Sequence, residues 1–289
     1  MKTIAFSLFL LIFLALPSTM VNAETPVSRL VATMKSAGNS SIQIATHLKN
    51  VLHIPPQVAA EILKVAGFRA SDVASALKNV FSLGTTNIAD ILRNVFNHTD
   101  TRIISILKQI GFKINAIASW LKSTNIHAED AAALLKTNFR PTNFVIAKSL
   151  KAAGWGINAV TKALLFIGVT ANEAGSILVR AFSAKDEAIA WALKVSGQSI
   201  NKVAAVLKHL GVTFQRASDL LKSVFNATDS ATENALAYAD YLINKPSTRS
   251  ISKSTKTTNF RLKSKKPIKQ HSSKIVCSKG KKLVNGKCI

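Results

Sequence analysis

A leucine followed by a lysine or arginine recurs along most of this chain. From Met34 to Leu221 this landmark position advances in 13 steps over 187 residues, a mean spacing of about 14.4 residues. The spacing equals four turns of an α-helix with 3.6 residues per turn, so the leucines are expected to repeat on one helical face. The landmarks are Met34, Leu48, Leu63, Leu77, Leu92, Leu107, Leu121, Leu135, Leu150, Leu164, Leu178, Leu193, Leu207 and Leu221, and all but Leu164 and Leu178 are followed directly by the cation.

Regular interruptions divide this pattern into short helices rather than one long rod. Four residues after the landmark stands a glycine in seven units, which is typical of a left-handed helix C-cap. Helix start signals follow at Pro55-Pro56, Ser71, Thr99-Asp100, Asn115, Asn158 and Ser199, and at the capping-box pairs Thr170 with Glu173 and Ser230 with Glu233. Each unit is therefore predicted to be a helix of about 10 to 12 residues followed by a turn.

A longer period is superimposed on the short one. Phe96, Phe139, Phe182 and Phe225 are spaced 43 residues apart, which groups three helices into one repeat. Helices this short are marginal alone and gain stability by stacking on their neighbours. The predicted fold is all-α, an α-solenoid of about fifteen short helices over residues 24–244. Its repeats are expected at 53–96, 97–139, 140–182 and 183–225, with 24–52 as an N-terminal cap and 230–244 as the closing helix.

A 43-residue repeat of three helices resembles the armadillo and HEAT class of α-solenoids. The resemblance covers repeat length and helix count only, because no family-specific motif is present and the three helices are expected to be equal in length. It therefore does not transfer the peptide-binding groove of armadillo proteins to this chain. Asn115, Asn158 and Asn201, which also recur every 43 residues, are interpreted as helix caps rather than groove ligands.

The first residues have the organisation of a secretory signal peptide. Lys2 precedes the 13-residue apolar stretch from Ile4 to Leu16, and Val21-Asn22-Ala23 provides small residues for cleavage. A membrane-spanning helix needs about 20 apolar residues, so an anchor is the less favoured interpretation. Residues 1–23 are therefore predicted to be removed by cleavage after Ala23, and the protein is expected to be secreted.

Positive charge is concentrated at the C-terminal end. Residues 245–289 hold 14 Lys and Arg and no acidic residue, whereas residues 24–244 hold 23 Lys and Arg against all 14 Asp and Glu. A segment of this composition is expected to attract polyanions, and residues 245–276 are predicted to form a disordered linker. The candidate polyanion-binding residues are Arg261, Lys263, Lys265, Lys266, Lys269, Lys279, Lys281 and Lys282.

The only two cysteines, Cys277 and Cys288, lie close together near the end of the chain. Export favours a disulfide between them, which would close a small loop within residues 277–289. The stretch from Cys277 to Cys288 resembles fragments of small extracellular cysteine-rich modules that contain Leu-Val-Asn-Gly-x-Cys. A zinc site would need further ligands, and only His271 is near, so neither a metal nor another cofactor is expected.

Several recurring side chains have two interpretations. The lysines after the landmark leucines are expected to complement the negative C-terminal ends of their helices, and the alternative is a basic row that faces an acidic surface. Trp120, Trp155 and Trp191 are predicted to pack between helices rather than to form a sugar-stacking platform. Sequons that would accept N-linked glycans in a eukaryotic host, but that also suit helix caps, begin at Asn39, Asn97 and Asn226.

The sequence contains no recognisable catalytic motif. The six histidines share no metal-ligand spacing, and neither a phosphate-binding glycine loop nor a nucleophile elbow occurs. The acidic pairs Glu129-Asp130 and Asp186-Glu187 fall in predicted first turns of helices, where carboxylates are stabilised electrostatically. The chain is therefore expected not to be an enzyme.

These features favour a secreted binding or scaffold protein. Its helical surface would serve a protein partner, and its tail would serve a polyanion such as an acidic glycan, a cell wall or anionic lipid. The alternative is a membrane-active cationic factor, such as a toxin, an antimicrobial protein or an effector, because short cationic amphipathic helices can refold onto lipid. An anionic membrane surface is thus a second candidate partner, and nucleic acid is expected only if the protein is delivered into a cell. The sequence sets no oligomeric state.

Overall fold

The structure, a computed structural model, describes residues 25–241, 283–284 and 287–288. The chain divides into two units, Met1–Lys245 and Pro246–Ile289. The described part of the first unit contains fifteen helices and no strand. They are α2 (Pro26–Ser36), α3 (Ser41–Asn50), α4 (Pro56–Val65), α5 (Ala70–Val80), α6 (Thr85–Phe96), α7 (Asp100–Gln109), α8 (Ile114–Ser123), α9 (Ala128–Phe139), α10 (Asn143–Ala152), α11 (Ile157–Phe166), α12 (Ala171–Phe182), α13 (Asp186–Val195), α14 (Ile200–His209), α15 (Phe214–Phe225) and α16 (Asp229–Tyr238).

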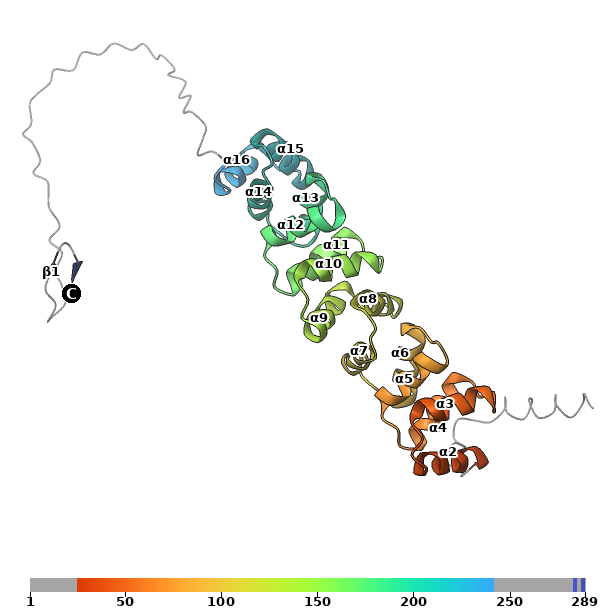
Figure 1. The fold of residues 1–289 in the computed structure, drawn as a ribbon. Coiled ribbons are helices and arrows are strands. Elements are labelled where there is room, and N and C mark those ends of the chain that lie inside the picture. The colour runs from red at the N-terminus through yellow and green to blue at the C-terminus, as the bar shows by residue number, and fades with distance from the viewer. Residues whose placement is uncertain (1–24, 242–282, 285–286, 289) are drawn as a thin grey trace, which may run out of the picture. The chain divides into compact units, whose positions relative to one another are not determined.

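Neighbouring helices pack in a repeated pattern. Each helix contacts the helix that follows it and the second helix after it, as far as the end of the stack at α16. Figure 1 shows the helices of this unit following one another along a single stack. The predicted α-solenoid is therefore confirmed. A helix of ten residues is only about 15 Å long, so most of its stability comes from these neighbours.

The landmark leucines form the core of the stack. All thirteen leucines of the series, from Leu48 to Leu221, have 0% of their surface exposed. The buried side chains form two clusters, one extending from Val31 to Ile177 and the other from Leu178 to Ala239. The boundary between the two clusters lies within α12. The 14.4-residue spacing therefore marks burial on one side of each helix from α3 to α15.

Within each repeat the third helix is longer than the other two. The helices α6, α9, α12 and α15 have 12 residues, whereas the two helices before each of them have 10 or 11. The expectation of equal helices is wrong because phenylalanine does not end a helix as glycine does, so the last turn continues through it. The left-handed residue then comes one position later, with φ of 51–54°, at Asn97, Arg140, Ser183 and Asn226.

The helix caps follow the sequence signals in part. Thr170 and Ser199 cap α12 and α14 as predicted, and each accepts a hydrogen bond from the backbone N–H three residues further on. The last helix is different, because it begins at Asp229 and has Thr228 as its cap. The predicted cap at Ser230 is therefore wrong by two residues.

The recurring asparagines lie inside the first turn of their helices, not at the caps. Asn115, Asn158 and Asn201 each follow an isoleucine that is already helical, so their interpretation as caps is wrong. Ser71 is likewise the second residue of α5. At this inner position a side chain can reach a neighbouring helix, as Asn115 does when its Oδ1 accepts a hydrogen bond of 2.7 Å from Ser149 Oγ on α10.

In the second unit the structure describes two short strands, β1 (Leu283–Val284) and β2 (Lys287–Cys288). They pair antiparallel, with Leu283 opposite Cys288 and Val284 opposite Lys287. Among all described residues, no helix has the length and apolar composition needed to cross a membrane. The predicted signal peptide and the predicted linker at 245–276 lie outside the described residues and stay predictions.

Candidate functional site

The lysines that follow the landmark leucines bridge pairs of helices. Nine of them donate from Nζ to a backbone carbonyl 30–32 residues further along the chain, at the C-terminal end of the next helix but one. In eight of these contacts the Nζ–O distance is 2.5–2.9 Å. These bridging lysines are Lys35, Lys49, Lys64, Lys78, Lys108, Lys136, Lys151, Lys194 and Lys208.

An aromatic ring accompanies most of the bridging lysines. Lys35 Nζ lies 4.9 Å from the centre of the Phe68 ring, and Lys108 Nζ lies 5.3 Å from that of Phe139. All of them except Lys136 have such a ring, at 4.9–5.7 Å. The ammonium group is attracted both to the face of the ring and to the negative end of the helix. Lysine and aromatic residue thus form one recurring contact between helices.

Each bridging lysine lies in the last turn of its own helix, as predicted. The prediction missed that its ammonium group bonds to the C-terminal end of the helix two further on. The reason is that a helix and its next neighbour but one are in direct contact. A basic row facing an acidic partner is disfavoured, because nine of its ammonium groups are already bonded to carbonyls of the stack.

Two helix pairs, α11 with α13 and α12 with α14, have no lysine or arginine directly after the landmark leucine. Leu165 on α11 and Val179 on α12 occupy the positions where the other units carry Lys or Arg. The aromatic residue is missing too, since Gln198 and Val212 stand in the corresponding places two helices later. Among the described residues, no side chain donates to the carbonyl of Ser196, the C-cap of α13. The end of α13 therefore lacks the lysine contact that the ends of nine other helices receive.

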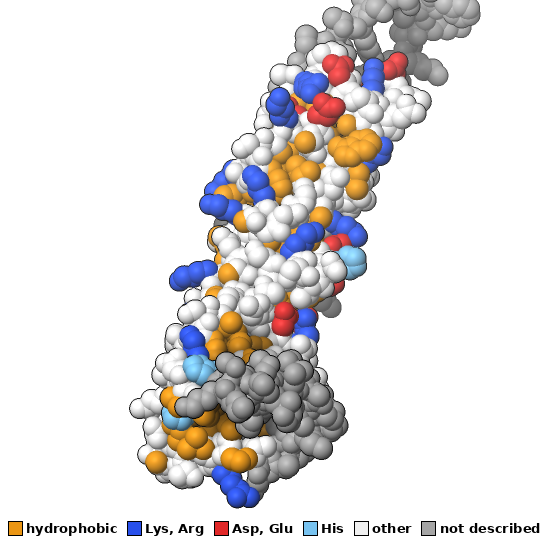
Figure 2. Space-filling model, turned by 90° about the vertical axis from the view of Figure 1, so that its right-hand side faces the viewer, with side chains coloured by type: hydrophobic (Ala, Val, Ile, Leu, Met, Phe, Trp, Pro, Cys, Tyr) orange, Lys and Arg blue, Asp and Glu red, His pale blue; other side chains and the backbone are white. Residues whose placement is uncertain are grey.

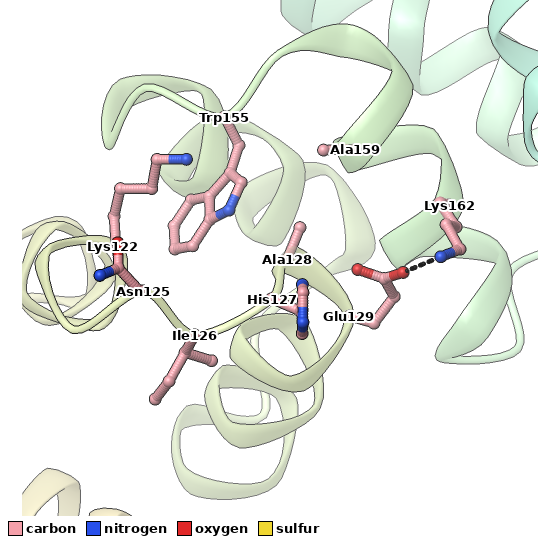
Figure 3. Close-up of a pocket in the computed structure, with 9 residues that line it drawn as sticks. All are labelled: Lys122, Asn125, Ile126, His127, Ala128, Glu129, Trp155, Ala159 and Lys162. Atoms are coloured by element: carbon pink, nitrogen blue, oxygen red, sulfur yellow. Dashed lines mark ion pairs between the residues drawn. The ribbon is translucent and has the colours of Figure 1, made fainter.

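Two adjoining hollows lie beside α9 and α11. The first, of about 360 Å³, is shown in Figure 3 and is lined by Lys122, Asn125, Ile126, His127, Ala128, Glu129, Trp155, Ala159 and Lys162. The second, of about 450 Å³, is named here the Leu165 hollow and is lined by His127, Glu129, Asp130, Lys162, Leu165, Phe166 and Ser196. The two hollows share His127, Glu129 and Lys162 as their common border.

An ion pair stands at this border. Lys162 Nζ on α11 lies 2.7 Å from Glu129 Oε1 in the first turn of α9, as the dashed line in Figure 3 marks. The hydrogen bond from Lys162 holds the pKa of Glu129 below its ordinary value. The adjacent Asp130 is exposed and forms no ion pair with any described residue. The Leu165 hollow therefore contains one carboxylate without a cationic partner.

The three tryptophans differ in burial. Trp120 is fully buried and Trp155 is 5% exposed, so the predicted packing is confirmed for both. Trp191 is 47% exposed, and the prediction is wrong there. Trp191 stands two residues before its landmark, a position that holds only Ala, Ser, Thr, Lys, Asp or Glu in the other units. It is an aromatic residue at a position that faces solvent.

Two further apolar residues share this part of the surface. Phe166 on α11 and Val195 on α13 are 63% and 54% exposed, and both stand two residues after a landmark leucine. Polar residues occupy most other positions of this kind. Figure 2 shows one face of the stack, on which apolar side chains gather in separate patches between lysine and arginine side chains. The apolar surface on α11 and α13 is a candidate for protein binding.

The other predicted site residues are only partly described. The sequon residues Asn97 and Asn226 are exposed left-handed caps at the ends of α6 and α15, and Asn39 donates from Nδ2 to the Met34 carbonyl at the end of α2. Their glycosylation stays a prediction. The predicted polyanion-binding residues all lie outside the described residues: Arg261, Lys263, Lys265, Lys266, Lys269, Lys279, Lys281 and Lys282.

The predicted disulfide between Cys277 and Cys288 is open to a direct test, since Cys277 also lies outside the described residues. The intact protein is expected to be two hydrogen masses lighter than the reduced chain and to resist alkylation until reductant is added. Intact mass spectrometry with and without reductant measures both. Two thiols that react freely without reductant would refute the bond, and a covalent dimer would show that the cysteines join two chains instead.

The described residues contain no group of three His, Cys, Asp or Glu side chains able to hold a metal ion. One contact between a serine and a histidine escaped the sequence analysis: Ser176 Oγ on α12 lies 3.2 Å from His209 Nε2 on α14. Ser176 Oγ also donates to the Asn172 carbonyl. A hydroxyl has one proton, so a serine bonded in this way accepts from the imidazole, the reverse of the direction that general-base catalysis requires.

Comparison with known proteins finds no family model that matches the sequence and no curated protein similar to it. Two parts of the chain are candidates for binding: the apolar surface on α11 and α13 with the Leu165 hollow, and the basic residues of 245–289 that the sequence indicates.

Proposed function

We propose that this chain is a secreted, non-enzymatic binding protein. Its helical stack offers a surface to a protein partner, and its basic tail attracts a polyanion such as an acidic glycan, a cell wall or anionic lipid. The observation that carries the proposal is that nine lysines of the stack are bonded to helix-end carbonyls. The other 14 Lys and Arg of residues 24–244 are matched in number by the 14 Asp and Glu of the same residues, so the excess positive charge open to a polymeric anion lies mainly in the 14 cations of the tail.

The alternative, a membrane-active factor, requires the helices to leave the stack and lay their apolar faces on lipid. Thirteen landmark leucines are fully buried between helices, and the bridging lysines join successive helix pairs. Refolding onto a membrane would disrupt both sets of contacts at once. These contacts favour binding by an intact stack over membrane disruption.

Retention on heparin tests the role of the tail. The full chain is expected to elute late from a heparin column, and deletion of residues 245–289 is expected to remove most of the retention. Exposed charges interact over about 10 Å at 0.1 M salt and about 3 Å at 1 M, so retention should vanish across that range. The measurement is the salt concentration at elution for the two chains.

A matched control keeps the length of the tail and removes its charge. Replacing the 14 Lys and Arg of residues 245–289 with Gln should lower retention as much as the deletion does. Retention that survives both changes would assign polyanion binding to the stack and overturn this part of the proposal. Dye release from anionic vesicles, measured in parallel, would support the membrane-active alternative, whereas binding without release supports the proposed function.

A further inference from the structure

The Leu165 hollow lies where a bridging lysine is missing. The helices α9 and α11, two apart in the chain, show the complete contact. Lys136 Nζ on α9 donates to the carbonyl of Ile167, the C-cap of α11, at a distance of 2.6 Å. Ile167 comes 31 residues after Lys136. The same step from Leu165 leads to Ser196, the C-cap of α13. Leu165 and Ser196 both line the hollow. The shorter, uncharged leucine therefore leaves both a space and a helix end without a cation.

The remaining lining suits a cation with an apolar stem. Asp130 supplies a carboxylate, and Phe166 supplies an exposed aromatic ring. Lys162, the cation of the lining, is held by Glu129 at 2.7 Å and leaves Asp130 free to accept a second positive group. Helix C-terminus, carboxylate and aromatic face are three separate features that attract a cation. Two of them are the features that hold the bridging lysines elsewhere in this chain.

The surface next to the hollow indicates that the cation belongs to a polypeptide. Val195 directly precedes Ser196, and Trp191 lies one helical turn before Val195 on the same face of α13. Both are exposed at positions that hold mostly polar residues in the other units. A free metal ion or a small amine would leave these apolar side chains exposed. The residues that flank a lysine or arginine in a protein would cover them.

The other helix pair without the cation, α12 and α14, is closely packed instead. Gly175 on α12 lies so near α14 that an added Cβ would meet Val206 Cγ1 at 2.6 Å. The two helices therefore approach each other closely at this point. Loss of the lysine at Val179 is accompanied by close packing, while its loss at Leu165 is accompanied by a hollow of about 450 Å³.

We infer that the Leu165 hollow binds a lysine or arginine side chain of a partner protein. The cationic group lies between Asp130 and the C-terminal carbonyls of α13, its stem lies on Phe166, and neighbouring apolar residues of the partner cover Val195 and Trp191. The partner thus completes the bridge that the chain itself lacks. This inference rests on the proposed binding role of the stack and names the chemistry of the partner segment.

The probe for the test is a short acetylated peptide with one lysine between two leucines. The control peptide carries norleucine in place of the lysine, which keeps the stem and removes the charge. The full chain, labelled with ¹⁵N, is titrated with each peptide by NMR. The lysine peptide should shift the amides of Val195, Ser196 and Gly197 saturably. The norleucine peptide should bind at least about tenfold more weakly, because the charge is the group recognised.

Two variants of the protein decide between this site and general charge attraction. Leu165→Lys supplies the missing bridge from within the chain, so it should raise the melting temperature and abolish the response to the lysine peptide. Val179→Lys adds the same charge at the other pair that lacks the cation and should leave the response unchanged. The inference is overturned by equal binding of the two peptides, by an unchanged response in Leu165→Lys, or by the absence of saturable shifts at Ser196.

The outcome is separable from that of the proposed function. Leu165→Lys leaves the tail intact, so its retention on heparin should equal that of the unmodified chain. A chain that is retained through its tail but shows no response at Ser196 overturns the inference and leaves the polyanion-binding role in place. A response at Ser196 with no tail-dependent retention supports the inference and overturns the role assigned to the tail.

Discussion

Replacing Leu107 with alanine is expected to lower the free energy of unfolding by about 2–5 kcal/mol. Leu107 has 0% of its surface exposed and is buried in α7 together with Ile103, Ile104 and Ile106. Alanine leaves a cavity at this position, because α7 is held on both sides by contacts with α5, α6, α8 and α9. Denaturant unfolding followed by far-ultraviolet circular dichroism measures the loss.

The control makes the same chemical change where the side chain is not enclosed. Leu30 on α2 is 37% exposed, so Leu30→Ala should cost under about 1 kcal/mol. The contrast tests the assignment of the landmark leucines to the core rather than the general effect of shortening a leucine. Comparable losses at the two positions would contradict that assignment.

The architecture was predictable because the spacing and the burial have the same cause. A leucine returns every 14.4 residues because each helix with its turn occupies about that length of chain, and one side of every helix must face its neighbours. The equal-length error arose at the phenylalanines, such as Phe96, where the helix continues and Asn97 takes the left-handed conformation. The sequence shows which residue stands there, but the end of the helix depends on the following residue adopting an unfavourable φ.

The exposure of Trp191 on α13 could be predicted from its position relative to the landmark leucine, but not from its residue type. Tryptophan is usually buried, and this expectation holds for Trp120, which directly precedes the landmark Leu121. Trp191 stands one position earlier relative to its own landmark, in a column that is otherwise small or polar. Aligning the units on their landmark would therefore have marked Trp191 as exposed, and Phe166 and Val195 by the same procedure.

The targets of the bridging lysines were not predictable from local pattern. A lysine is placed on its helix by the short period, but its partner carbonyl lies 30–32 residues away and depends on which helices are in contact. One long-range signal does exist in the sequence. All bridging lysines but Lys136 are paired with an aromatic residue two helices later, and both are missing together at Leu165 with Gln198 and at Val179 with Val212.

Replacing Lys78 with methionine is expected to weaken the contact between α5 and α7 by about 1–2 kcal/mol. Lys78 Nζ donates to the Ile110 carbonyl at 2.5 Å and lies 4.9 Å from the centre of the Phe112 ring. Methionine keeps the unbranched stem and the helix propensity, so the change removes the charge and its hydrogen bond. A hydrogen bond from a charged group contributes about 1.5–3 kcal/mol, and the value is lowered here because Lys78 is half-exposed to solvent.

Lys148→Met is the matched control, since Lys148 is an exposed lysine of α10 that has no hydrogen bond or ion pair with the described residues. Its free energy of unfolding should change by less than about 0.5 kcal/mol. Amide exchange should rise at the C-terminal end of α7 in Lys78→Met and stay unchanged there in Lys148→Met. Equal effects of the two changes would show that the bridges contribute nothing to stability. The lysines of the stack would then be available to outside anions, and retention on heparin should survive deletion of the tail.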